Sequence, residues 1–269
     1  MDCVKPTEIA GQILAVGTAK ANLPVRQLVV RGMLAGAYLA VATSMSVTAA
    51  VQTGQWIVGA LIFPFGLCLV VLLGTELITG SFALLPVAAM EGKEGAGIGR
   101  VFQNWSWVFL GNLLGSVFYA VLLAIALTMD WSGEVSPIGK KLIAMAEQKT
   151  TGYAAFQTAG MITVFAKAIL CNWLVSLAVV MAFATTSLVG KIVAMWGPVV
   201  LFFSQGFEHT VVNMFVIPVG MMMGANVSVW DWWVWNQIPV TLGNLIGGMV
   251  FTGLAIYVSH KPAVGHAKA

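Results

Sequence analysis

The chain alternates between long apolar runs and short polar segments from residue 28 to residue 259. Most of these runs are longer than the ~20 residues that a helix needs to cross the hydrocarbon core of a bilayer. They are also continuous, whereas the strands of a membrane β-barrel are ~10-residue segments that alternate between apolar and polar positions. We therefore expect an all-α integral membrane protein with six transmembrane helices. The helices are expected at residues 28–51, 56–90, 101–129, 153–188, 192–223 and 236–259.

Two of these segments, the second and the fifth, contain a polar interruption. The second reads Gly-Thr-Glu at residues 74–76, and the fifth reads Gly-Phe-Glu-His at residues 206–209. Both segments exceed the length of one straight crossing, so each is expected to be a broken helix. An ionisable side chain at membrane depth costs roughly 2.5–3.5 kcal/mol on insertion scales. The glutamate and histidine at these positions are therefore candidates for a functional or supporting site.

The two interruptions belong to an internal repeat. The pairs Gly74/Gly206 and Glu76/Glu208 are both 132 residues apart, and Gly-Asn-Leu-x-Gly at 111–115 recurs at 243–247 with the same offset. Each unit holds three spans, which is an odd number, so the second unit must enter the membrane from the opposite face. The sequence thus predicts inverted repeats at about residues 28–129 and 153–259, with the broken helices meeting near the membrane midplane. The repeated glycines are expected to let helices pack closely.

Composition and charge exclude several other classes of protein. Of the 269 residues, 59% are hydrophobic and 9% are charged, whereas soluble domains carry about 25% charged residues. The net charge of +3 and the scattered basic residues do not fit nucleic-acid binding. The three cysteines lack metal-ligand spacing, and no nucleophile or cofactor motif accompanies Glu208 and His209. We expect no metal, no cofactor and no enzyme activity.

The distribution of lysine and arginine indicates the orientation in the membrane. With six spans both termini lie on one side, and that side carries nine of these residues against three on the other. Loops rich in lysine and arginine remain in the cytoplasm. We therefore expect an inner-membrane protein with both termini in the cytoplasm. It is divided into an N-terminal segment at 1–27, a channel domain at 28–259 and a tail at 260–269.

The broken helices suggest what the centre of the membrane holds. The second half of each is expected to begin near Thr79 or Thr210, and the positive dipole end of a helix favours an anion. Each break also leaves backbone N–H groups that need partners within the protein or pore water. We expect the carboxylates of Glu76 and Glu208 to accept hydrogen bonds from these groups and so to support the two breaks.

His209 is the candidate for direct contact with a transported species. It can donate a hydrogen bond, and it can also carry a proton. The alternative is a structural histidine bonded to a neighbour such as Asn172. The nearest rival function is a neutral-solute channel of the aquaporin type. Such a channel would normally carry Asn-Pro-Ala caps at its two half-helices, and neither break has one.

Four segments of the chain resemble signatures of the formate/nitrite transporter family. Residues 206–220 resemble its fifth-helix signature, residues 74–80 its second-helix Ω-loop, residues 171–175 its fourth-helix signature and residues 238–248 its sixth. The similarity covers essentially the whole membrane portion. It implies an aquaporin-like helical fold, a homopentamer in the lipid bilayer with one pore per subunit, and transport of a small anion such as formate or nitrite.

The resemblance also implies roles for single residues along the pore. Two apolar constrictions would flank the central His209. Leu77 and Phe202 would form the cytoplasmic constriction, and Phe63 would contribute to the other. Thr79 would hydrogen-bond the substrate near the Ω-loop. A pore lined in this way is narrow and favours the smallest anions.

Other matches concern support of the histidine and the path of the proton. Asn172 and Glu208 would hold His209, and Asn236 is a looser pore-side match. A bare ion cannot cross an apolar constriction cheaply, because an isolated buried charge costs far more than a neutral group. We therefore hypothesise that the anion takes a proton from water or from His209, crosses as the neutral acid and ionises again on the far side.

The family also carries a lysine in the outer vestibule, which attracts the anion. Lys149 is the best match, although residues 150–160, between it and Asn172, hold about two helical turns more than the family pattern. Lys167 is the rival, and it corresponds to Arg31 of the other repeat. The sequence does not select among formate, nitrite, hydrosulfide and short carboxylates.

Overall fold

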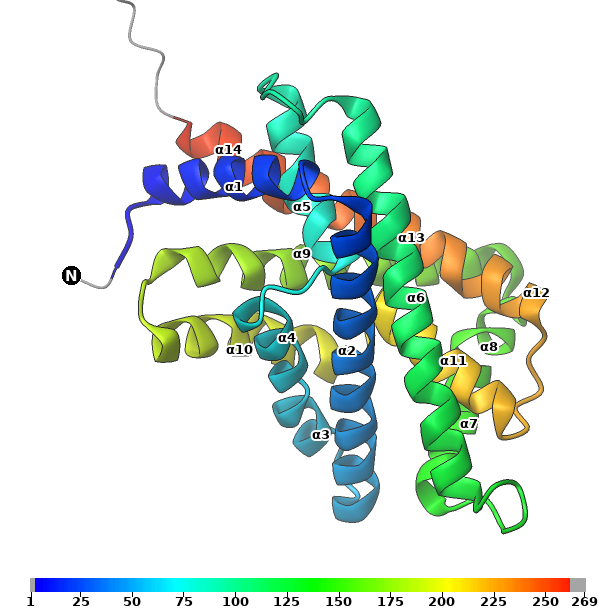
Figure 1. Ribbon diagram of the computed structural model, residues 1–269. Helices are drawn as coiled ribbons and strands as arrows, with labels where there is room; N and C mark the ends of the chain where they lie inside the picture. Colours follow the sequence, from blue (N-terminus) through cyan, green and yellow to red (C-terminus); the bar gives the residue numbers. More distant parts are fainter. Residues whose placement is uncertain (1–2, 262–269) are drawn as a thin grey trace, which may run out of the picture.

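The computed structural model describes residues 3–261, which form helices and the turns between them (Figure 1). No β-strand occurs in this range, so the expected all-α class is confirmed. The first half of the chain contains α1 (Pro6–Ala21), α2 (Val25–Thr53), α3 (Trp56–Ile62), α4 (Pro64–Leu72), α5 (Ile78–Met90) and α6 (Ile98–Thr128). The second half contains α7 (Pro137–Lys149), α8 (Thr151–Ala154), α9 (Gln157–Met181), η1 (Ala182–Ala184), α10 (Leu188–Ser204), α11 (Thr210–Met222), α12 (Val229–Trp232), η2 (Trp233–Gln237), α13 (Ile238–Gly248), η3 (Met249–Leu254) and α14 (Ala255–His260).

Four helical stretches of the described chain are long and apolar enough to cross a bilayer. They are α2, α6, the stretch Gln157–Ala184 and the stretch Val229–His260. Each of the two segments that were expected to be broken consists of shorter apolar helices, as a broken helix should. Residues 73–77 separate α4 from α5, and residues 205–209 separate α10 from α11. The helix therefore stops at both polar interruptions.

The connection between the expected spans at 101–129 and 153–188 contains a further helix, α7. Ser136 caps this helix by accepting a hydrogen bond from the N–H of Gly139, and Pro137 occupies its first turn. Serine followed by proline is a recognised helix start, so the signal was present in the sequence. The next membrane helix begins at Gln157 rather than at residue 153, because the short α8 precedes it.

Helices α2 and α6 lie side by side and run in the same direction (Figure 1). Glycines allow this approach. A Cβ atom on Gly111 would lie 2.7 Å from the carbonyl oxygen of Val29, so a larger residue has no room there. The same holds where α9 lies beside α13, because a Cβ on Gly243 would lie 2.6 Å from the Cβ of Ala168. The expected packing role of the repeated glycines is confirmed.

The half-helices α5 and α11 occupy the centre of the molecule. Every residue of α11 from Thr210 to Gly220 is buried, and so is every residue of α5 from Ile78 to Leu85. A helix that is buried on all sides is packed within other helices rather than facing solvent or lipid. The N-terminal ends of both half-helices, which follow the two breaks, are therefore held deep inside the protein.

The N-terminal segment is part of this packed structure. Helix α1 lies across the end of the bundle, beside α14 and against α5 (Figure 1). Its residues Ala10 and Ile13 are fully buried and pack with Leu84, Val87 and Tyr257. This packing brings the last turn of α1 close to the first break.

Candidate functional site

Asn112 of α6 supports the first break. Its side-chain Oδ1 accepts a hydrogen bond from the N–H of Ile78 at 3.0 Å. Its Nδ2 donates to the carbonyl oxygens of Glu76 at 2.8 Å and Gly32 at 2.9 Å. One amide therefore satisfies an N–H and a carbonyl of the broken helix and ties both to α2. Gly74, at the turn, has a φ of 62°, a left-handed conformation that suits glycine.

Asn244 of α13 makes the corresponding contacts at the second break. Its Oδ1 accepts from the N–H of Thr210 at 2.9 Å, and its Nδ2 donates to the carbonyl oxygens of Glu208 at 2.9 Å and Ala168 at 2.8 Å. Gly206 has a φ of 64°, close to that of its counterpart at the first break. At each break an asparagine thus satisfies one backbone N–H and one backbone carbonyl. The expectation that the two glutamate side chains do this is wrong, because these carboxylates bind other groups.

Each buried glutamate pairs with a lysine from another helix. Lys20, at the end of α1, lies 2.7 Å from Glu76, and Lys149, at the end of α7, lies 2.9 Å from Glu208. Both glutamate side chains are at most 4% exposed. Sequence reasoning missed Lys20. The available signal was its place ahead of the first span, which matches the place of Lys149 ahead of the fourth.

Glu208 lies in a wider network. Its carboxylate accepts hydrogen bonds from Tyr153 Oη at 2.8 Å and from Asn213 Nδ2 at 2.8 Å. Asn236 Nδ2 donates to the same carboxylate at 3.3 Å and to the backbone carbonyl of Lys149 at 2.9 Å. Asn236 therefore supports the ion pair between the glutamate and the lysine.

His209 caps the second half-helix with its own ring. Its Nδ1 accepts hydrogen bonds from the N–H groups of Val211 at 3.2 Å and Val212 at 3.3 Å. The N-cap of α11 is therefore His209, and the helix begins at Thr210. With Nδ1 acting as an acceptor, the network assigns the ring hydrogen to Nε2, which lies 3.2 Å from Thr79 Oγ1 and donates to it.

Asn172 acts on Thr79 rather than on His209. Its Nδ2 donates to the carbonyl oxygen of Thr79 at 3.1 Å and to that of Asn244 at 2.7 Å, and its Oδ1 accepts from Ser176 at 3.2 Å. Within residues 3–261, neither Asn172 nor the side chain of Glu208 hydrogen-bonds to the histidine ring. The direct support expected from these two side chains is absent there, and the ring is held by Thr79 and the start of α11.

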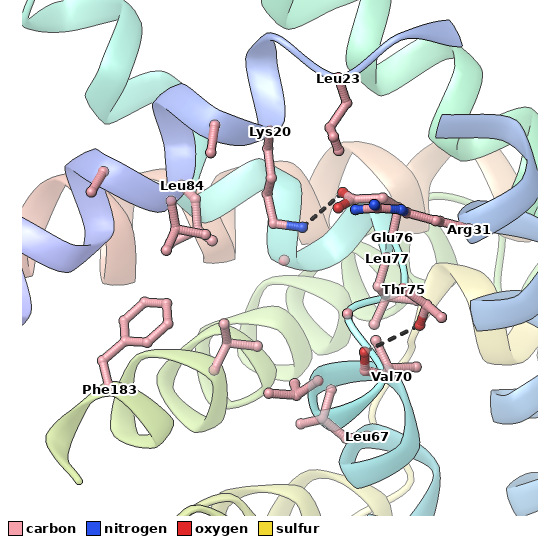
Figure 2. A pocket seen from close by; sticks show the side chains of 17 residues that line it. Lys20, Leu23, Arg31, Leu67, Val70, Thr75, Glu76, Leu77, Leu84 and Phe183 are labelled. Atoms are coloured by element: carbon pink, nitrogen blue, oxygen red, sulfur yellow. Dashed lines mark hydrogen bonds and ion pairs between the residues drawn. The ribbon is translucent and has the colours of Figure 1, made fainter. Parts of the chain in front are cut away.

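Two cavities flank the centre of the protein. The first, of about 450 Å³, is mostly apolar and is lined by Lys20, Glu76, Arg31 and Leu77 among others; we call it the Lys20 cavity (Figure 2). Figure 2 shows the side chain of Lys20 reaching from α1 to Glu76.

The second cavity, of about 280 Å³, lies on the far side of His209 and is more polar. It is lined by Lys149, Tyr153, Lys167 and Glu208 among others, and we call it the Lys149 cavity.

Between the two cavities lies a void of only about 10 Å³. Phe63, Leu77, Phe202 and His209 line it, and the Phe202 and His209 rings stack with centroids 5.9 Å apart. A space of this size is at the limit for holding one water molecule. Leu77 also lines the Lys20 cavity, whereas Phe202 also lines the Lys149 cavity. Both residues that were expected to form one constriction therefore line the narrow void, and each of them also faces one of the two larger cavities.

Comparison with known proteins identifies the family. The family model described as formate/nitrite transporter matches residues 7–258. A probable formate transporter of Methanothermobacter thermautotrophicus is 37% identical, covering 95% of this chain and 96% of the relative. The formate channel FocA of Escherichia coli K12 is 30% identical, covering 96% of this chain and 94% of the relative.

Solved structures agree with this assignment. An FNT family ion channel has a TM-score of 0.80 at 29% identity, covering 94% of this chain and 99% of the other. A pentameric formate channel with formate bound has a TM-score of 0.71 at 30% identity, covering 88% and 97%. The chain therefore belongs to the formate/nitrite transporter family and is a multi-pass membrane transport protein rather than an enzyme.

Proposed function

We propose that this chain is a channel subunit that moves a small weak acid, with formate as the first candidate, across the membrane together with a proton. The observation that carries the proposal is the very small space beside His209 at the centre of the protein. A void of about 10 Å³ separates two larger cavities, and each of these contains a lysine next to a buried glutamate. The relatives described above support formate by name.

The narrow centre selects against a bare ion. An anion that enters the void has to leave its water behind, and burying an isolated charge costs far more than burying a neutral group. Protonation of a weak acid removes that cost. The cationic side chains of the two cavities concentrate anions at both entrances, since charged clefts gather counter-ions. Phe63, Leu77 and Phe202 leave room only for small species. Nitrite, hydrosulfide and short carboxylates are the alternatives to formate as the transported species.

The geometry of His209 favours a hydrogen-bond donor over a proton source. Protonation of Nδ1 would remove the acceptor that caps α11 through Val211 and Val212. Complete loss of the hydrogen on Nε2 would leave an anionic ring in an apolar site. His209 can instead transfer its hydrogen bond from Thr79 to a passing acid. We therefore assign the proton itself to water in the cavities.

We further infer that the chain crosses the membrane six times, as two inverted three-span units. Asn112 and Asn244, 132 residues apart, make the same set of hydrogen bonds at the two breaks. α2 and α6 run in the same direction, as the first and third spans of one unit must (Figure 1). By the distribution of lysine and arginine, the Lys20 cavity opens to the cytoplasm, with both termini on that side of the inner membrane.

A homopentamer is the assembly we propose, because the solved neighbour at 30% identity is described as pentameric. Large apolar side chains on the outer faces of α6 and of the last span are available to contact lipid or other subunits. Among the exposed ones are Phe118, Leu122, Val250 and Val258.

Uptake of formate by purified protein in liposomes, measured by stopped flow at several external pH values, tests the proposal. We expect uptake that becomes faster as the external pH falls. His209→Asn is the informative variant, because asparagine can still cap α11 but cannot reach Thr79 as the ring does. Its acid-stimulated uptake should fall about tenfold, as expected for the loss of one hydrogen bond of about 1.5 kcal/mol.

Two outcomes would contradict these statements separately. Water flux without formate uptake in the parent protein would indicate a neutral-solute channel. Full acid-stimulated uptake by His209→Asn would remove the histidine from the mechanism while leaving the formate channel intact.

A further inference from the structure

Each cavity contains one further half-buried cationic side chain besides the lysine that pairs with a glutamate. In the Lys149 cavity it is Lys167 of α9, and in the Lys20 cavity it is Arg31 of α2. The two residues occupy equivalent positions relative to the breaks. The backbone N–H of Glu208 donates to the carbonyl oxygen of Lys167, and the backbone N–H of Glu76 donates to that of Arg31. Each of the two cations is therefore anchored beside a break.

The two kinds of cation differ in how their charge is compensated. The ammonium groups of Lys149 and Lys20 lie within 3 Å of a carboxylate oxygen. In the described part of the chain, no ion pair involves Lys167 or Arg31. A paired lysine and glutamate together contribute no net charge to the cavity, whereas an unpaired cation attracts an anion from solution.

Lys167 is also positioned to bind. Its Nζ donates to Tyr153 Oη at 3.3 Å and lies 5.6 Å from the centre of that ring. Tyr153 Oη in turn donates to Glu208, so the tyrosine fixes the lysine beside the ion pair. A lysine ammonium has three N–H donors, and the tyrosine occupies one of them. The other two can hold an anion in the Lys149 cavity, which His209 also lines.

We propose that Lys167, and not Lys149, is the residue that holds the anion entering the Lys149 cavity, with Arg31 as its counterpart in the Lys20 cavity. Lys149 and Lys20 are positioning residues that keep the glutamates and the breaks in place. This inference rests on the proposed transport of a small anion. Lys141, the remaining lysine of the Lys149 cavity, is exposed, so solvent screens its charge more strongly.

Formate uptake into proteoliposomes, measured over a range of formate concentrations at low and at high ionic strength, tests this assignment. Lys167→Gln should raise the half-saturating concentration about threefold to tenfold, as expected when one charge a few ångströms from the bound anion is removed in a water-filled mouth. It should also weaken the dependence of uptake on ionic strength, which a purely structural role would not change. Lys167→Arg should keep both properties.

Lys140→Gln is the matched control, because Lys140 is exposed on α7 and does not line the Lys149 cavity. It should behave like the parent protein. Lys149→Gln should lower the amount of assembled protein or the maximal rate, while the half-saturating concentration of the remaining activity stays near that of the parent.

The results separate the inference from the function on which it rests. Absence of formate uptake by the parent protein would overturn the proposed function and this inference with it. Uptake by the parent, with Lys167→Gln indistinguishable from Lys140→Gln, would overturn the inference alone, and so would a shift of half-saturation confined to Lys149→Gln. If Lys167→Gln does not assemble, Arg31→Gln assayed from the opposite face decides the question, because the same shift is expected there.

Discussion

Removing the charge of Lys149 should destabilise the protein far more than removing an exposed lysine, because it leaves Glu208 as a buried carboxylate without a counter-charge. The two charged groups are 2.9 Å apart, and their side chains are 14% and 2% exposed. Deleting one partner of a buried pair typically costs about 3–5 kcal/mol, because the remaining charge is left uncompensated. The ion pair is thus expected to be a main support of the second break.

The remaining partners of Glu208 determine where in this range the cost falls. Tyr153, Asn213 and Asn236 still donate hydrogen bonds to the carboxylate after the lysine is gone. These donors continue to stabilise the negative charge, so we expect the lower end, about 3 kcal/mol, for Lys149→Met. At about 2–4 °C per kcal/mol for a chain of this length, the Tm should fall by roughly 6–12 °C.

Thermal unfolding of the purified protein, followed by tryptophan fluorescence and by size-exclusion chromatography, measures this effect. The double variant Lys149→Met/Glu208→Gln should recover most of the lost stability, because neutral replacement of both members of a buried pair is often close to neutral. Lys140→Met serves as the control for loss of one exposed positive charge from α7. The reasoning is refuted if Lys149→Met unfolds at the same temperature as this control, or if the double variant is no more stable than the single one.

Two further predictions concern the breaks and the ends of the helices. Replacing Asn112 or Asn244 by alanine leaves one N–H and two carbonyl groups without their partner, at a cost of about 1–3 kcal/mol for each buried group. The free energy of unfolding of each variant should therefore fall by about 3 kcal/mol or more, which is measured as a lower Tm. Replacement by aspartate, which keeps only the acceptor, should not restore the stability. A second effect depends on pH: the hydrogen bond from Lys261 at 2.6 Å, aided by its charge, lowers the pKa of Glu91. A carboxyl group whose pKa is lowered on folding contributes stability above its unfolded pKa and loses it as the pH falls through its folded pKa. Lys261→Gln should therefore speed amide hydrogen exchange in α14 at neutral pH and make no difference in acid, and equal effects at both pH values would contradict this.

The sequence by itself determined the class of the protein and the positions of both breaks. Lipid offers no hydrogen-bonding partners, so a membrane span has to be continuously apolar and helical, and its interruptions stand out as polar residues. The 132-residue repeat likewise identified positions with equivalent backbone roles. Gly74 and Gly206 both adopt the left-handed conformation, at a φ of 62° and 64°. These features depend on residues close together in the chain.

Only the tertiary structure decided which side chains meet. Lys20 pairs with Glu76 across 56 residues, and nothing in the local sequence of either residue indicates the other. Asn172 was expected to hold His209, yet it binds the carbonyl of Thr79, 93 residues away. Such partners depend on the rotation and height of one helix relative to another, which follow from the packing of whole helix faces rather than from the apolar pattern that marks each helix. The sequence therefore indicates where helices break, while packing determines what holds the breaks.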